Sequence, residues 1–122
     1  MYELNYFQTF DVPLIVTNSV YNEVPKALIQ YLFSMAFYRG KVLGNDTAYM
    51  QVFNVRCEEN DGKTLFIVSM EQENPDMTTV GFMSAGCEKW SGTIWLIESW
   101  NGNKENPEPD EHYITMLFPE EY

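Results

Sequence analysis

The sequence has few of the residues on which most catalytic and metal-binding sites depend. Its 122 residues include two cysteines, one histidine and seven basic side chains. Cys57 and Cys87 make neither a disulfide framework nor a thiolate metal cage, so we expect both to be reduced. The shortage of Lys and Arg leaves a net charge of −11, which opposes direct binding to a nucleic-acid backbone.

Long apolar stretches and nucleotide-binding motifs are also missing. The longest apolar runs, 12–16 and 31–38, fall far short of the roughly 20 residues that a membrane-spanning helix needs. The first residues lack the basic flank of a signal peptide, so we expect a cytoplasmic protein that makes no membrane contact. Neither a Walker-type phosphate loop nor a GxGxxG fingerprint occurs, and we expect no cofactor.

The hydrophobic residues that are present suffice for one core. They make up 45% of the chain, and aromatic residues alone make up 16%. Each buried aromatic ring removes roughly 150–250 Å² from water, so the core should be rich in aromatic side chains. At this length a second domain would be undersized, and we predict a single globular domain over residues 1–122.

One segment has the periodicity of a helix that buries a broad face. Apolar residues between Leu28 and Phe37 recur at spacings of three and four. Asn22 is suited to the helix cap and Pro25 to the first turn. Gly40 provides a left-handed stop, with Arg39 favourable at the negative helix end. We therefore predict one helix from about residue 23 to Gly40.

Six segments have the β-branched or alternating patterns of strands, namely residues 13–17, 48–57, 64–71, 78–83, 93–100 and 112–118. Asn18-Ser19 is expected to end the first strand, and Asp61-Gly62 predicts a hairpin between the second and third. Residues 1–11 are interpreted as an extended arm whose pairing stays open. The prediction is an α+β fold, with one central helix packed on a mostly antiparallel sheet of about five to six strands in the order β-α-β-β-β-β-β.

No catalytic constellation is evident in the sequence. His112 is the only histidine, and Cys87 has no partner that would activate its thiol, so we expect both to be structural. Glu71, Glu73 and Asp76 form an oxygen-rich cluster of the kind that holds Ca²⁺ or Mg²⁺, but their spacing fits no EF-hand loop. We expect no metal site and no enzymatic activity.

Acidic residues gather in two segments of the chain. Residues 58–76 carry six acids against one lysine, and residues 98–122 carry seven acids against one lysine. Solubility explains such surfaces, and docking to a basic partner is the alternative. Trp90, in a loop, is expected to serve local packing, and anchoring a partner is the alternative. The candidate partner-binding residues are Trp90, Glu71, Glu73, Asp76, Glu105, Glu108, Asp110 and Glu111.

Short stretches over nearly the whole chain carry a resemblance to a known family. They are Val16-Thr17, Glu23-Val24-Pro25, residues 49–53, Glu71-Gln72-Glu73 with Pro75, residues 94–97 and the ending 115–122. In this order they resemble the domain of unknown function 960 family, small proteins of Gram-positive bacteria and their phages. The chain departs from the family pattern at residues 84–92 and 99–111. Because the function of that family is not established, the resemblance implies a fold and a bacterial or phage setting, but no active site.

Three functions are compatible with these patterns. The leading hypothesis is a small non-enzymatic acidic binding or accessory protein that docks a protein partner. The second is a phage-type inhibitor that mimics nucleic acid and blocks a DNA-binding defence protein, which requires both acidic segments on one continuous face. The third is a small enzyme with carboxylates and tyrosines in a pocket. A homodimer formed through a sheet edge is left open.

Overall fold

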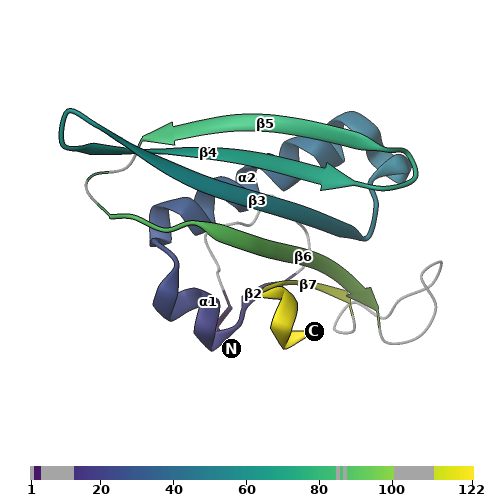
Figure 1. The fold of residues 1–122 in the computed structure, drawn as a ribbon. Helices are drawn as coiled ribbons and strands as arrows, with labels where there is room; N and C mark the ends of the chain where they lie inside the picture. The colour runs from purple at the N-terminus through teal and green to yellow at the C-terminus, as the bar shows by residue number, and fades with distance from the viewer. Residues whose placement is uncertain (1, 4–12, 85, 87, 101–111) are drawn as a thin grey trace.

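One mixed sheet organises the chain in the computed structural model, which describes residues 2–3, 13–84, 86, 88–100 and 112–122. Its strands are β1 (Tyr2–Glu3), β2 (Leu14–Val16), β3 (Met50–Asn60), β4 (Lys63–Gln72), β5 (Met77–Ser84), β6 (Gly92–Trp100) and β7 (His112–Leu117). Their order across the sheet is β1-β2-β7-β6-β3-β4-β5 (Figure 1). Among the described strands, only β2 and β7 pair in parallel.

The α+β class and the mostly antiparallel sheet are therefore confirmed, since five of the six strand pairings are antiparallel. Each of the six predicted strand segments overlaps one observed strand. The predicted order of elements is wrong in two respects. The N-terminal arm contributes the two-residue strand β1, which pairs with β2. The described chain also contains two α-helices, α1 and α2, instead of the one that was predicted.

The extra helix, α1 (Asn18–Glu23), begins where the first strand was expected simply to end. Thr17 is its extended N-cap, and its hydroxyl oxygen accepts a hydrogen bond from the Val20 N–H at 3.3 Å. Val24 then returns to the extended region, the conformation that a following proline favours. Pro25 therefore separates α1 from α2 (Lys26–Leu43), and the predicted cap at Asn22 is wrong because this residue lies inside α1.

The predicted stop at Gly40 is also wrong, because α2 continues through it for another turn to Leu43. The helix ends at Gly44, which has a φ of 57° and donates its N–H to the Gly40 carbonyl. A glycine inside a helix costs only about 1 kcal/mol relative to alanine, which the hydrogen bonds of the added turn offset. A short 3₁₀ turn, η1 (Gly44–Asp46), then leads towards β3.

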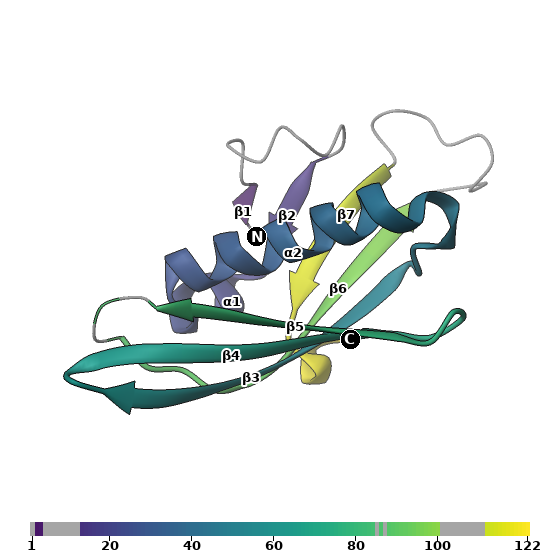
Figure 2. The same ribbon diagram turned by 90° about the horizontal axis from the view of Figure 1, so that it is seen from above.

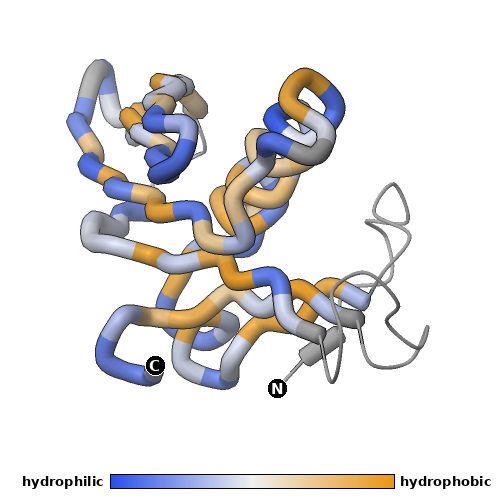
Figure 3. Tube along the Cα trace, turned by 90° about the vertical axis from the view of Figure 1, so that its right-hand side faces the viewer, coloured by the Kyte–Doolittle hydropathy of each residue, from blue (hydrophilic) through white to orange (hydrophobic). Residues whose placement is uncertain are grey.

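Helix α2 packs across one face of the sheet, and the core lies between them (Figure 2). Phe33 of α2, Phe53 of β3 and Phe66 of β4 have no exposed surface. Hydrophilic and hydrophobic residues alternate along the strands, as the period-two geometry of a strand requires (Figure 3). Phenylalanines contribute to the core, but most of the described core is aliphatic, and aromatics such as Tyr38, Tyr49 and Phe82 are exposed.

The hairpin of β3 and β4 is confirmed, with nine paired residues between Val52 and Asn60. Its turn residues Asp61 and Gly62 have φ values of 53° and 77°, the positive values that a two-residue hairpin turn needs. Strand β5 follows β4 and pairs with no other described strand, so it forms one edge of the sheet. The C-terminal turn η2 (Pro119–Glu121) lies on the sheet side opposite α2 (Figure 2). The Tyr122 ring contacts Trp95, with 5.5 Å between the ring centroids.

Candidate functional site

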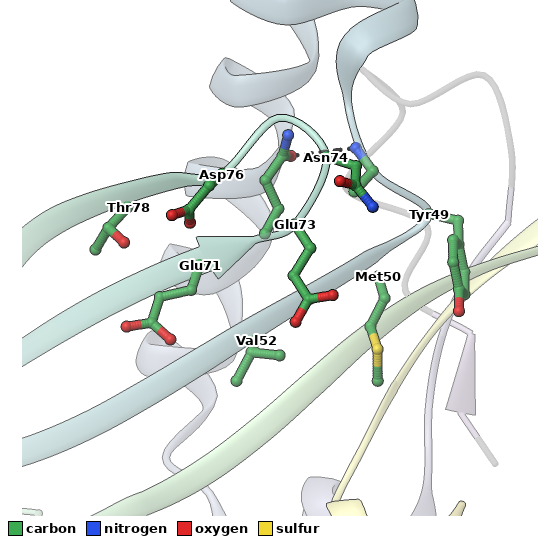
Figure 4. A pocket seen from close by; sticks show the side chains of 10 residues that line it. Tyr49, Met50, Val52, Glu71, Glu73, Asn74, Asp76 and Thr78 are labelled. Carbon is green, nitrogen blue, oxygen red and sulfur yellow. Dashed lines mark hydrogen bonds between the residues drawn. The ribbon is translucent and has the colours of Figure 1, made fainter.

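A pocket of about 660 Å³ lies where the β4–β5 turn meets the start of β3. The segment before β3, β3 itself, β4, the turn and β5 all contribute to it (Figure 4). Its lining is formed by Ala48, Tyr49, Met50, Val52, Glu71, Gln72, Glu73, Asn74, Asp76 and Thr78. We call it the acidic pocket.

Three of the predicted partner-binding residues meet in this pocket. Glu71 ends the outward-facing row of β4, Glu73 and Asp76 belong to the turn, and all three are exposed. Within the described part of the chain, the salt bridges involve Glu58 and Glu59 but none of these three carboxylates. Their negative charge is therefore not neutralised by a described lysine or arginine.

The remaining wall of the pocket is apolar and aromatic. Met50 and Val52 alternate outward along β3, away from the buried Gln51 and Phe53. Tyr49 is 55% exposed and stands beside Met50, while Glu71 and Glu73 lie over the Val52 and Met50 side of the pocket (Figure 4). Carboxylates beside an exposed ring and an aliphatic surface are suited to the cationic head and the methylene stem of a lysine or arginine side chain.

A buried glutamine fixes the turn that carries the acids. Gln72 is 3% exposed, and its Nε2 donates to the carbonyls of Asp46 and Pro75 at 3.0 and 3.1 Å. Its Oε1 accepts from the Ala48 N–H and from Gln51 Nε2 at 3.1 and 2.8 Å. Because all four hydrogen-bonding positions of the amide are used, the turn is tied to both the η1 segment and the start of β3.

The same network continues to a buried arginine on α2. Arg39 is 4% exposed, and its Nη1 donates to Gln51 Oε1 at 2.8 Å. Its Nη2 donates to the Met70 carbonyl at 2.9 Å and to Thr79 Oγ1 at 2.6 Å. Burial lowers the pKa of Arg39, because desolvation disfavours the charged guanidinium. Sequence reasoning assigned Arg39 to the negative helix end and missed this role.

Trp90, the predicted aromatic anchor, lies away from the acidic pocket. Its half-buried ring stacks on Phe118 with centroids 6.0 Å apart, and it packs against the hydrophobic core. A Cβ at Gly92 would approach the indole to 3.0 Å, so the loop closes tightly around the ring. These contacts favour the alternative in which Trp90 serves local packing.

The other predicted candidates in the acidic C-terminal segment are not among the residues that the structure describes. Glu105, Glu108, Asp110 and Glu111 lie outside the described residues, as does Cys87. His112 begins β7 and is paired with Trp100. Over the ranges that the structure describes, no three His, Cys, Asp or Glu side chains are grouped so that they could hold a metal ion.

Comparisons with protein-family models, with curated proteins and with solved structures found no match. The resemblance to the domain of unknown function 960 family therefore stays a prediction. Among the described helices, none combines the length and apolar character needed to cross a membrane.

Proposed function

We propose that this protein is a non-enzymatic binding domain that docks a basic, extended segment of a protein partner at the acidic pocket. The observation that carries the proposal is the convergence of Glu71, Glu73 and Asp76 on one pocket beside Tyr49, without a described cation to pair with them. A lysine or arginine of the partner would supply the missing charge. The overall charge of −11 would attract such a partner from a distance.

The sheet surface next to the pocket supports an extended rather than a compact partner. On the side opposite α2, strands β4 and β5 present Ile67 and Phe82 as directly paired neighbours. Phe82 is 62% exposed, and within the described chain no element covers it. On an extended partner segment, an apolar side chain an even number of residues from the basic one lies on the same face and would reach this surface.

The edge strand β5 offers a second means of recognition. Its eight residues, from Met77 to Ser84, contain neither proline nor a charged side chain, the devices that commonly protect an edge. An extended segment can add to such an edge through backbone hydrogen bonds, while its side chains reach neighbouring pockets. The acidic pocket lies at the start of β5, where it would select a basic residue.

Mimicry of nucleic acid gains less support from the described acids. Those between residues 58 and 61 lie at one end of β4, and those between residues 71 and 76 lie at the other (Figure 1). Eight residues of β4, Lys63 to Met70, lie between the two groups, which corresponds to roughly 26 Å. Neutral and basic side chains such as Ser69 and Arg56 occupy the face between the two groups.

An enzyme that uses carboxylates and a tyrosine is a second candidate, because Tyr49 shares the pocket with the three acids. The replacement Tyr49→Phe separates the two proposals. It keeps the ring that would pack on a basic side chain and removes only the hydroxyl. Docking predicts that peptide affinity is retained, whereas a catalytic tyrosine predicts loss of turnover with binding intact.

A peptide of repeating Arg-Ser-Val-Ser, which places arginine and valine on one face of an extended strand, tests the docking proposal directly. The triple variant Glu71→Gln, Glu73→Gln, Asp76→Asn should bind this peptide about tenfold more weakly than the wild type, because each exposed ion pair contributes up to about 1 kcal/mol. Isothermal titration calorimetry at low and high salt would measure both dissociation constants.

The control is a second triple variant at the opposite end of the hairpin, Glu58→Gln, Glu59→Gln, Asp61→Asn. It changes the net charge by the same amount, and Asn tolerates the positive φ of position 61. The proposal expects near wild-type affinity for this control. If both triple variants weaken binding equally, the peptide responds to net charge alone. That result would contradict docking at the acidic pocket.

A further inference from the structure

A second cavity lies between α2 and the edge strand β5, on the helix side of the sheet. It has a volume of about 400 Å³, within the range of roughly 300–1,000 Å³ that small-molecule sites occupy. Most of its lining is apolar or aromatic and includes Tyr31, Met35, Tyr38, Val42, Met77 and Val80. We call it the α2–β5 groove.

A positive charge lies at the inner wall of this groove. Arg39 is among the lining residues although it is 4% exposed, and no described carboxylate pairs with it. Its three hydrogen bonds go to neutral oxygens, and its Nε is buried without a partner. A buried guanidinium without a counter-ion is costly, so an anion in the groove would gain from the low dielectric around it.

Thr79 connects this charge to the open part of the groove. Its hydroxyl oxygen accepts from Arg39 Nη2 at 2.6 Å, which leaves the hydroxyl proton available for another acceptor. Thr79 is exposed and lines the groove, in contrast to its neighbour Thr78, which lines the acidic pocket. The Thr79 hydroxyl is therefore positioned to donate to an anion whose charge Arg39 attracts.

We propose that the α2–β5 groove binds a free alkyl carboxylate, with the carboxylate at the Thr79 hydroxyl and the chain along the apolar wall. Tyr38 and Val42 are 68% and 79% exposed, which is unusual for large apolar side chains on a helix that otherwise buries its apolar face. An alkyl chain would cover both. The charge at one end and the apolar wall along the rest favour an amphipathic ligand over inorganic phosphate.

Decanoate, below its micelle concentration, is the probe for this proposal, and calorimetry on the full-length protein is the measurement. The wild type should bind decanoate and should bind decanol about tenfold more weakly, because a hydrogen bond to a charged group contributes roughly 1.5–3 kcal/mol. Thr79→Val should weaken decanoate by about tenfold, whereas Thr78→Val, one residue earlier on the same strand, should leave its affinity unchanged.

A second pair of variants keeps the test independent of the Thr79 hydrogen bond. Val42→Glu places a negative charge on the groove wall and should weaken decanoate, whereas Gln30→Glu adds the same charge to an exposed part of α2 outside the lining. Three results would overturn the proposal. They are equal affinity for decanoate and decanol, no decanoate binding in the millimolar range, and equal effects of the two variants in either pair. Binding to anionic phospholipid vesicles instead of free decanoate would overturn the assignment to a free carboxylate.

Discussion

At the scale of single residues, the most informative positions are polar side chains inside the core. Gln51, Gln72 and Arg39 are each at least 96% buried, and their hydrogen bonds join α2, β3, β4 and the β4–β5 turn. Such networks are stabilising only when nearly every donor and acceptor is satisfied. The turn that carries the acidic pocket therefore depends on residues that lie beneath it.

Gln72→Glu tests this dependence with an almost isosteric change. A carboxylate would keep the acceptor positions but lose both amide donors, leaving the carbonyls of Asp46 and Pro75 opposite another acceptor. We expect the free energy of unfolding to fall by about 2–3 kcal/mol, the cost of unsatisfied buried polar groups. Urea denaturation followed by circular dichroism would measure it.

Gln30→Glu is the control for this change, since Gln30 is exposed and the substitution alters the same chemical group. Exposed substitutions usually change stability by less than about 0.5 kcal/mol. A Gln72→Glu variant that is as stable as Gln30→Glu would contradict the role assigned to the buried amide.

The strand pattern contains a signal for this network, because two glutamines occupy positions that the alternation assigns to the core. The alternation predicted the strands but not the hydrogen bonds of these glutamines. Gln51 is in phase with Phe53 and Val55, and Gln72 is in phase with Val68 and Met70. A polar residue at a position that the period-two pattern assigns to the core calls for a partner. The partner, Arg39, could not be inferred because helix periodicity alone does not show which strand a helical residue faces.

At the scale of elements, the strands were predictable and the helix boundaries were not. Alternating or β-branched runs predict strands because one face of each strand is buried and the other is exposed. The break between α1 and α2 depends on Thr17 as a cap and on the extended Val24 before Pro25. The predicted boundary residues Asn22 and Gly40 instead lie inside α1 and α2.

Gly40 inside α2 and Gly44 at its C-cap allow a matched test of where the helix ends. Gly40 lies inside the helix and Gly44 has a φ of 57°, yet a Cβ added at either position would contact nothing within 4 Å. Gly40→Ala should therefore raise the free energy of unfolding by about 0.5–1 kcal/mol, because alanine loses less entropy in a helix. Gly44→Ala should lower it by about 1 kcal/mol or more.

Thermal unfolding of both variants under one buffer condition checks these signs. Since neither side chain meets a neighbour, differences reflect the backbone alone. Destabilisation by Gly40→Ala together with a neutral Gly44→Ala would mean that the helix ends at Gly40 in solution.

At the scale of the whole molecule, the sheet separates two surfaces with opposite electrostatic character. The side that α2 covers contains the buried Arg39 and the α2–β5 groove, and the opposite side leads to the acidic pocket. The edge strand β5 borders both, because Thr78 and Thr79 point to different sides. The sequence predicted the acids of the pocket, since Glu71, Glu73 and Asp76 are close in the chain, but not the contribution of Tyr49 and Met50 from another strand.

The most direct measurement of docking at the acidic pocket is a heteronuclear NMR titration of the labelled protein with the Arg-Ser-Val-Ser peptide. We predict that the largest amide shifts fall in residues 71–82 and at Tyr49 and Met50, while the distant turn at residues 58–63 changes little. Shifts concentrated at residues 58–63, or spread evenly over all exposed acids, would contradict docking at the acidic pocket.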